Sequence, residues 1–255
     1  MSTLNKYAER FDNIALERRD GILQMRLHTR GGPLLWGFKD ASSVHAQLGD
    51  AFYEIGRDRD NKVVILTGTG DSFMTGVDEQ QGLSGPMSPE IWDRLMKEGK
   101  DLLMNLLDIE APMISAVNGP VLLHPELPTL SDIVLAAEHA EFADLLHFPW
   151  GGTVPGDGAH VWWPLVLGPN RGRAFLLMGQ RISAREALSL GLVAEVLPAP
   201  QLLERAWAIA RELIAKSPLA LRHARNVLVQ DLKRRLLNDL GYGLGVEGLA
   251  ILSQK

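Results

Sequence analysis

Two histidines and one aspartate stand in stretches of this sequence that are nearly free of charge and are interrupted by proline and glycine. His124 lies in the segment 118–126, and His147 and Asp157 lie in the segment 147–160. Ionisable groups are costly to hide among apolar residues, so their presence there indicates an active site. A histidine beside a carboxylate is a common arrangement for general acid–base catalysis near neutral pH.

Asp157 has two interpretations. It follows Pro155 and Gly156 and precedes an apolar run that starts at Ala159, so it could cap a helix. It could instead fix the tautomer of His147 and stabilise the imidazolium that forms when this ring takes a proton. The residues alone leave both interpretations open.

The loop that carries His124 also carries Glu126, with few other polar residues nearby. Pro120, Pro125 and Pro128 predict irregular backbone through this loop. A structural histidine and a catalytic one are equally well supported at this position.

A third loop, residues 68–78, is rich in glycine, which lets backbone amides approach a ligand closely. The amide of Val77 could therefore donate to an oxyanion. The alternative is a simple tight turn. We find no Walker loop, metalloprotease or EF-hand pattern, so we expect no metal and no cofactor.

Composition excludes several classes of protein. The chain has 255 residues, a formal net charge of −5 and no cysteine. An acidic chain is a poor partner for nucleic acid or an anionic membrane, and the lack of cysteine excludes disulfides and thiolate chemistry. The first ten residues lack the apolar core of a signal peptide, and no uncharged stretch is long enough to span a bilayer. We expect a cytoplasmic protein.

The elements that must position these loops follow from hydrophobic spacing. Residues 13–19 and 22–28 alternate apolar and polar side chains around Asp20 and Gly21, which predicts a β-hairpin. Further strands are expected at 62–67, 113–117, 132–137, 140–142 and 193–197, and helices at 40–57, from Ser88 onward and at 183–190. An α/β fold with parallel strands and crossover helices is the simplest architecture.

Beyond Pro198 the pattern becomes helical, breaks at Pro218, and continues as another helix and a glycine-spaced tail. We therefore divide the chain into a core, residues 1–198, and a helical C-terminal region, residues 199–255.

Five segments occur in a specific order and spacing: residues 72–78, 116–120, 131–138, 152–156 and 179–193. Together they resemble the crotonase (enoyl-CoA hydratase/isomerase) superfamily over nearly the whole chain. The resemblance implies a crotonase-like spiral of ββα turns with a helical C-terminal trimerisation region, hence a homotrimer or a dimer of trimers.

The sequence departs from the thioester-using members of this superfamily. Leu122, Leu123 and His124 stand where those members have a glycine-rich run that completes the oxyanion hole. Glu126 aligns with a hydratase glutamate, but the second hydratase glutamate has no counterpart near His147. The segments 124–126, 147–149, 154–160 and 168–173 instead resemble the branch of 6-oxocamphor hydrolase and related β-diketone hydrolases.

That branch cleaves a carbon–carbon bond without coenzyme A, by retro-Claisen hydrolysis. The resemblance implies that His147, oriented by Asp157, activates water, and that His124 and the indole of Trp36 bind the oxygens of a small neutral diketone. Trp36 and Glu247 match two further pocket positions of the branch. Glu247 would orient Trp36 or water. The alternative, that Glu247 is only an exposed charge on a helix, is equally well supported.

Two other functions remain open. An enoyl-CoA hydratase or isomerase would use Glu126 and would turn over crotonyl-CoA. A scaffold or RNA-binding member of the superfamily is disfavoured by the acidity of the chain.

Overall fold

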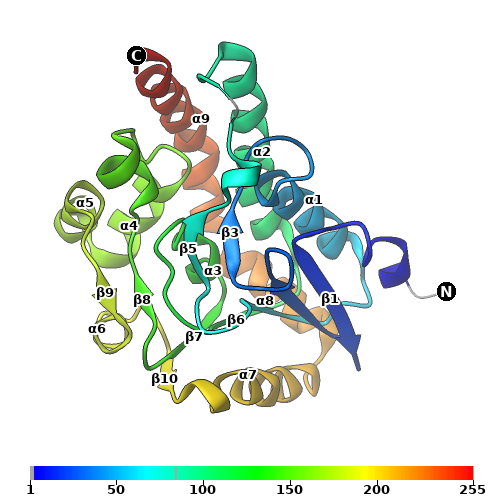
Figure 1. Cartoon of the computed structure of the whole chain (residues 1–255). Coiled ribbons are helices and arrows are strands. Elements are labelled where there is room, and N and C mark those ends of the chain that lie inside the picture. Colours follow the sequence, from blue (N-terminus) through cyan, green and yellow to red (C-terminus); the bar gives the residue numbers. More distant parts are fainter. Residues whose placement is uncertain (1–2, 84, 255) are drawn as a thin grey trace.

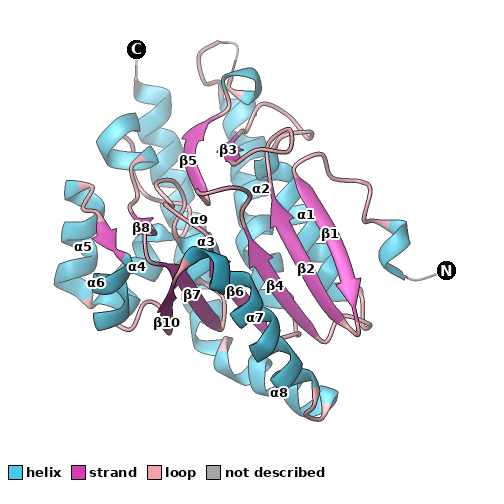
Figure 2. Ribbon diagram, turned by 60° about the horizontal axis from the view of Figure 1, so that its bottom comes forward, coloured by secondary structure: helices cyan, strands magenta, loops and turns pink. Residues whose placement is uncertain are grey.

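The computed structural model describes residues 3–83 and 85–254. Its main sheet has six strands in the order β1-β2-β4-β6-β7-β10, with β1 antiparallel to β2 and the other pairs parallel (Figures 1 and 2). The strands are β1 Ile14–Arg19, β2 Ile22–Leu27, β3 Leu34–Trp36, β4 Val63–Thr67, β5 Met74–Val77, β6 Met113–Val117, β7 Ile133–Ala137, β8 Glu141–Phe142, β9 Ile182–Ser183 and β10 Glu195–Leu197.

The α-helices are α1 Val44–Arg57, α2 Pro89–Asp108, α3 Glu126–Thr129, α4 Ala159–Leu167, α5 Pro169–Met178, α6 Ala184–Ser189, α7 Ala199–Ile214, α8 Pro218–Leu228 and α9 Gln230–Ser253. Short 3₁₀ turns cover Thr3–Lys6 and Glu79–Gln81, and a π-helical turn covers Leu146–Gly151. The predicted α/β class with parallel strands and crossover helices is confirmed. None of the described helices combines the length and the apolar character needed to cross a membrane.

The hairpin predicted at Asp20 and Gly21 is confirmed. Both residues have positive φ, 53° and 85°, which is the backbone of a type I′ turn that joins twisted antiparallel strands. The predicted start of α2 is also confirmed, because the Ser88 side chain accepts a hydrogen bond from the Ile91 amide and Pro89 occupies the first turn.

Helices cover both faces of the main sheet, so its central strands β4 and β6 are buried along their whole length and are largely apolar. Val63 and Ile65 of β4 pack in one cluster with residues of α7, while Val64 and Leu66 pack in the cluster that includes α1 and α2. Figure 2 shows α7 crossing one face of the sheet and α1 and α2 behind the other.

A second, smaller layer positions the loops of interest. β3 pairs with β5 in parallel, β8 pairs with β9, and Val121 forms isolated bridges to Met74 and Phe142 that join the two pairs. This layer places Trp36, at the end of β3, close to the residues that follow Val121.

The prediction of a glycine-spaced tail after the second C-terminal helix is wrong. Residues 230–253 form one helix, α9, which includes those glycines. A Cβ on Gly243 would lie 2.3 Å from the Gly156 carbonyl oxygen, and a Cβ on Gly248 would lie 2.0 Å from Trp92 Nε1. The glycines therefore permit close helix packing, a requirement that a single-sequence pattern does not reveal.

The apolar core crosses the expected boundary between residues 198 and 199. Leu236, Leu240 and Leu244 of α9 belong to the same buried cluster as Leu102 and Leu103 of α2. Figure 1 shows α2 and α9 side by side.

Candidate active site

His147 lies in the π-helical turn, where the Trp150 amide donates to the Leu145 carbonyl oxygen five residues before it. π-helical turns are rare and occur frequently at functional sites. This turn places His147 above Asp144, and His147 Nδ1–H donates to both Asp144 carboxylate oxygens, at 2.8 and 2.9 Å. Asp144 is 1% exposed. It therefore fixes the tautomer and the ring plane of His147.

Asp144 was not expected at this site from the sequence, and Asp157 was expected to orient His147. The structure instead places Asp157 at the other nitrogen of the ring. Asp157 Oδ2 lies 3.3 Å from His147 Nε2. A usable signal exists in the sequence, because Asp144 is the only charged residue in the stretch 142–156.

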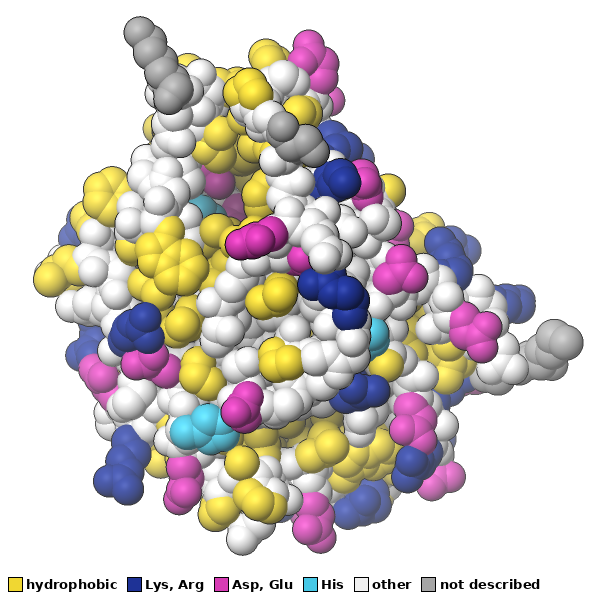
Figure 3. Space-filling view, in the orientation of Figure 1, with side chains coloured by type: hydrophobic (Ala, Val, Ile, Leu, Met, Phe, Trp, Pro, Cys, Tyr) yellow, Lys and Arg dark blue, Asp and Glu magenta, His cyan; other side chains and the backbone are white. Residues whose placement is uncertain are grey.

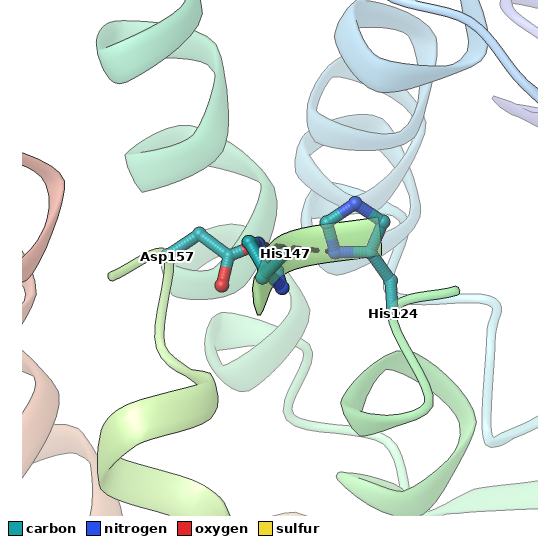
Figure 4. A group of neighbouring side chains, drawn as sticks. All are labelled: His124, His147 and Asp157. Carbon is teal, nitrogen blue, oxygen red and sulfur yellow. Dashed lines mark ion pairs between the residues drawn. The ribbon is translucent and has the colours of Figure 1, made fainter. Parts of the chain in front are cut away.

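Asp157 joins the two histidines. The same Oδ2 atom lies 3.0 Å from His124 Nδ1, and the two imidazole rings meet edge to face with centroids 5.3 Å apart. Figure 4 shows the three side chains converging from separate segments. The helix-cap interpretation of Asp157 is wrong: α4 has Gly158 as its N-cap residue, without a side-chain hydrogen bond.

His124 has the backbone of a left-handed turn, with φ 45°. Such a conformation costs a residue other than glycine about 1–3 kcal/mol and is concentrated at functional sites. It presents Nδ1 to Asp157 and to Glu126, each at 3.0 Å, and leaves Nε2 buried without a hydrogen-bond partner among the described residues.

The irregular backbone predicted from the prolines is only partly right. Residues 126–129 form one turn of helix, α3, that includes Pro128. The first amides of a helix have no acceptor within it, so proline is tolerated there.

Electrostatics favour protonated histidines in this cluster. Burial alone would lower the pKa of His124, but Asp157 and Glu126 outweigh burial and raise it to about 10. In the same way, Asp157 and Asp144 outweigh burial and hold the pKa of His147 well above its usual value. Burial raises the pKa of Asp157, yet the two histidines outweigh it and hold this pKa well below its usual value.

Glu247 lies on α9 and is buried, so the alternative of an exposed helix charge is wrong. Its Oε1 atom lies 3.8 Å from His147 Nε2, and its Oε2 atom is buried without a partner among the described residues. Burial and the charge of Asp157 raise the pKa of Glu247 to about 8. Burial is also the first cause of a raised pKa at Glu126.

Trp36 packs against His124, with ring centroids 4.2 Å apart and planes 42° apart. No described residue accepts a hydrogen bond from its indole N–H. The register of β3 and β5 places Val77 directly beside Trp36, but Val77 is not among the described residues that line the cavity. The structure thus brings Trp36 to the cluster and leaves Val77 outside it.

A cavity of about 230 Å³ opens onto the cluster. Its floor carries the ionisable groups His124, His147, Asp157, Glu126 and Glu247, and its walls are mostly apolar, with side chains of α2 and α9 among them. Figure 3 shows a hollow with yellow walls and with magenta and cyan atoms at its base. A small cavity with apolar walls and a few convergent polar groups suits a small, largely apolar molecule.

His124, His147 and Asp157 are also residue types that bind metals, and they offer three ligand atoms within 4.8 Å of one another. A histidine ligand must use a deprotonated nitrogen. His124 Nδ1 instead faces two carboxylates, and the pKa of this ring is about 10. The arrangement therefore fits a shared proton better than a metal ion.

The family model of enoyl-CoA hydratase/isomerase matches residues 18–243. Carnitinyl-CoA dehydratase of Salmonella arizonae is 32% identical over 200 residues, which cover 75% of each chain.

Among solved structures, a β-diketone hydrolase from the cyanobacterium Anabaena sp. PCC 7120, bound to (S)-3-oxocyclohexyl acetic acid, is 45% identical with a TM-score of 0.91. The match covers 99% of this chain and 97% of that one. An enoyl-CoA hydratase/isomerase from Mycobacterium paratuberculosis is 25% identical with a TM-score of 0.85, over 95% of both chains.

Proposed function

This chain belongs to the enoyl-CoA hydratase/isomerase family, the crotonase superfamily, and we propose that it is a hydrolase that cleaves a carbon–carbon bond of a small cyclic or bicyclic β-diketone. One observation carries this proposal: two buried histidines meet on one aspartate at the floor of an apolar cavity. The 45% identity to a β-diketone hydrolase supports it.

Retro-Claisen hydrolysis begins with the attack of water on one carbonyl carbon. His147 Nε2 takes the proton from water, while Asp144 holds Nδ1–H and Asp157 stabilises the imidazolium. General base help of this kind accelerates a reaction by about 10²–10⁴. The base must be neutral at this moment, so the raised pKa of His147 limits the fraction of enzyme that can react at neutral pH.

The negative charge that develops on the attacked oxygen needs a donor. The unpartnered N–H of the His124 imidazolium and the indole N–H of Trp36 supply it. A preorganised donor of this kind contributes about 3–4 kcal/mol to the transition state. His124 thus takes the place of the glycine amide that its thioester-using relatives employ.

Collapse of the tetrahedral intermediate breaks the bond between the attacked carbonyl carbon and the carbon that lies between the two carbonyl groups. The electron pair passes to the departing carbon and its carbonyl as an enolate, and the His147 imidazolium returns its proton to that carbon. The products are a carboxylic acid and a ketone within one molecule, and one water is consumed. A bicyclic 1,3-diketone would give a cyclic keto acid of the type bound to the Anabaena protein.

The test is an assay without coenzyme A. The substrates are cyclohexane-1,3-dione and the bicyclic 1,3-diketone whose ring opening gives 3-oxocyclohexyl acetic acid. We expect chromatography and mass spectrometry to show a keto acid, with heavy oxygen from labelled water in its carboxylate. Activity should survive dialysis against a chelator, whereas loss that is restored by a metal ion would assign the histidines to a metal. Absence of any keto acid contradicts the proposal.

A second candidate is an acyl-CoA hydratase or dehydratase that uses Glu126. Two observations favour it: the 32% identity to carnitinyl-CoA dehydratase, and the place of Glu126 on the floor of the cavity. Against it, Glu126 Oε1 is engaged by His124 Nδ1. Turnover of crotonyl-CoA without cleavage of either diketone would decide for this candidate.

A further inference from the structure

A third histidine, His45 on α1, lines the same cavity and has no part in the proton transfers described above. Its ring stands edge-on to Trp36, with centroids 5.6 Å apart and planes 85° apart. Trp36 therefore contacts both His45 and His124. Each of these contacts orients the indole.

The ring of His45 is held from α2. Burial raises the pKa of Glu98, but His45 and Arg94 outweigh it and keep this pKa below its usual value. An ionised carboxylate can only accept hydrogen bonds, so His45 Nδ1–H donates to Glu98 Oε2 at 2.8 Å. Arg94 donates to the other carboxylate oxygen at 2.7 Å and to the carbonyl oxygens of Phe38 and Lys39.

This arrangement leaves Nε2 of His45 without a hydrogen-bond partner in the described part of the chain. Nε2 lies beside Gly99, where a Cβ would be 3.7 Å away from it and 3.9 Å from Leu244 Cδ2. Gly99 and Leu244 also line the cavity. Glycine is a poor helix former, and no backbone atom comes near enough to require it at this position. The space in front of His45 Nε2 thus exists because residue 99 is a glycine and has no side chain.

We propose that His45, held by Glu98 and left uncovered by Gly99, is a second hydrogen-bonding subsite of the cavity, which takes a ring oxygen of the substrate remote from the attacked carbonyl. The inference rests on the proposed function and names a contact of that same site: in a β-diketone this oxygen belongs to the second carbonyl group, which remains in the product as the ring ketone of 3-oxocyclohexyl acetic acid. A neutral ring accepts from a hydroxyl at Nε2, and a protonated ring donates to a ketone.

The test measures binding without turnover. The probes are cyclohexylacetic acid and its 3-oxo and 3-hydroxy derivatives, whose carboxylates can pair with the histidine cluster. The wild-type protein should bind at least one oxygen-bearing acid about 3- to 10-fold more tightly than cyclohexylacetic acid, because a hydrogen bond contributes about this factor. The derivative that benefits shows whether His45 accepts or donates.

Two variants address the subsite without altering the proposed catalytic groups. His45→Phe keeps a ring against Trp36, and Gly99→Ala covers Nε2. Both should abolish the preference for the oxygen-bearing acid and leave the affinity for cyclohexylacetic acid unchanged. Gly245→Ala is the matched control, a glycine of α9 with open space around its Cβ position, and it should keep the preference. Thermal melting shows whether each variant is folded.

Equal binding of all three acids by the wild-type protein overturns the inference, and so does a preference that survives in both variants. If no acid binds at all, the proposed function fails together with it. If the preference is found but diketones are not hydrolysed, the subsite stands and only the proposed reaction is wrong.

Discussion

At the scale of single residues, the site is defined by which ring atom faces which carboxylate. Asp144 binds Nδ1 of His147, and Asp157 lies between Nε2 of His147 and Nδ1 of His124. The two aspartates therefore differ in role: one orients a single ring, and the other couples two rings. Substitutions at these positions should separate the roles.

Removal of the proposed base is the first prediction. His147→Ala should lower kcat by at least ~10² and leave the mass measured in solution unchanged, because it removes only the group proposed to take the proton from water. Steady-state kinetics and size-exclusion chromatography measure the two effects. His139→Ala is the control, since this histidine is exposed. Turnover close to wild type would falsify the role of His147.

Asp144→Asn tests the orienting carboxylate. Asparagine can donate an N–H to Nδ1, which moves the imidazole proton to Nε2 and removes the base. By analogy with the tautomer effect in hydrolase triads, kcat should fall by about 10²–10⁴. The melting temperature should change little, because asparagine has the same shape. Unchanged kcat would show that Asp144 only packs against the ring.

The pH dependence of kcat follows from the raised pKa of His147. A base acts when neutral, and the charges of Asp157 and Asp144 outweigh burial to hold this pKa well above its usual value. Activity should therefore rise with pH, by about tenfold per unit below the pKa of His147, until the His124 imidazolium, whose pKa is about 10, begins to lose its proton. Asp144→Asn removes one of these charges, so any residual activity should level off at lower pH. An activity that falls with rising pH while the pH is still below about 10, with the protein still folded, contradicts His147 as the base.

At the scale of elements, the loop before Asp157 and helix α9 depend on one close crossing. A Cβ on Gly156 would lie 2.2 Å from the Gly243 carbonyl oxygen, and a Cβ on Gly243 would lie 2.3 Å from that of Gly156. The crossing holds Asp157 and Glu247 on the same side of the cavity. Backbone contact of this kind cannot be relieved by a rotamer change.

The expected result of Gly156→Ala and of Gly243→Ala is a loss of stability of about 1–3 kcal/mol, as for overpacked cores. Diketone hydrolysis should fall more than the folded fraction does, because Asp157 and Glu247 shift relative to His147. Gly245→Ala in the same helix has nothing within 4 Å of its Cβ and should be neutral or stabilising. Chemical denaturation compares the three variants, and equal stability of all three would rule out the crossing as a constraint.

At the scale of the whole molecule, helices α8 and α9 expose a series of large apolar side chains. They are Leu219, Val227, Leu228, Leu237, Tyr242 and Leu249, each at least 61% exposed. Exposed apolar side chains in such number on two adjoining helices mark an interaction surface. We propose that this surface is the contact between chains of a homotrimer, which can pair into a hexamer.

The corresponding prediction is that light scattering gives three or six times the mass of one chain. Leu228→Asp should shift the mass toward the monomer, because a charge at an apolar contact is strongly unfavourable. Leu188→Asp, on α6 outside these two helices, should keep the wild-type mass. A wild-type protein that is monomeric at micromolar concentration would contradict the proposal that this surface joins chains of a homotrimer.

Several features followed from the sequence by itself because they depend on local pattern. Alternation and turn residues at Asp20 and Gly21 gave the hairpin, and Ser88 with Pro89 gave the start of α2. Uncharged stretches interrupted by proline pointed to His124, His147 and Asp157, since a buried charge is costly wherever it occurs. The family resemblance added Trp36 and Glu247, which no pattern in the chain singles out.

Tertiary structure decided the rest, because those features depend on contacts between distant segments. The glycines of 230–253 lie within a helix and not a tail because the loop at Gly156 and the side chain of Trp92 press against them. Asp157 faces two rings and caps no helix because His124 reaches it from another loop. His45 becomes part of the cavity only because α2 brings Glu98 and Gly99 beside it.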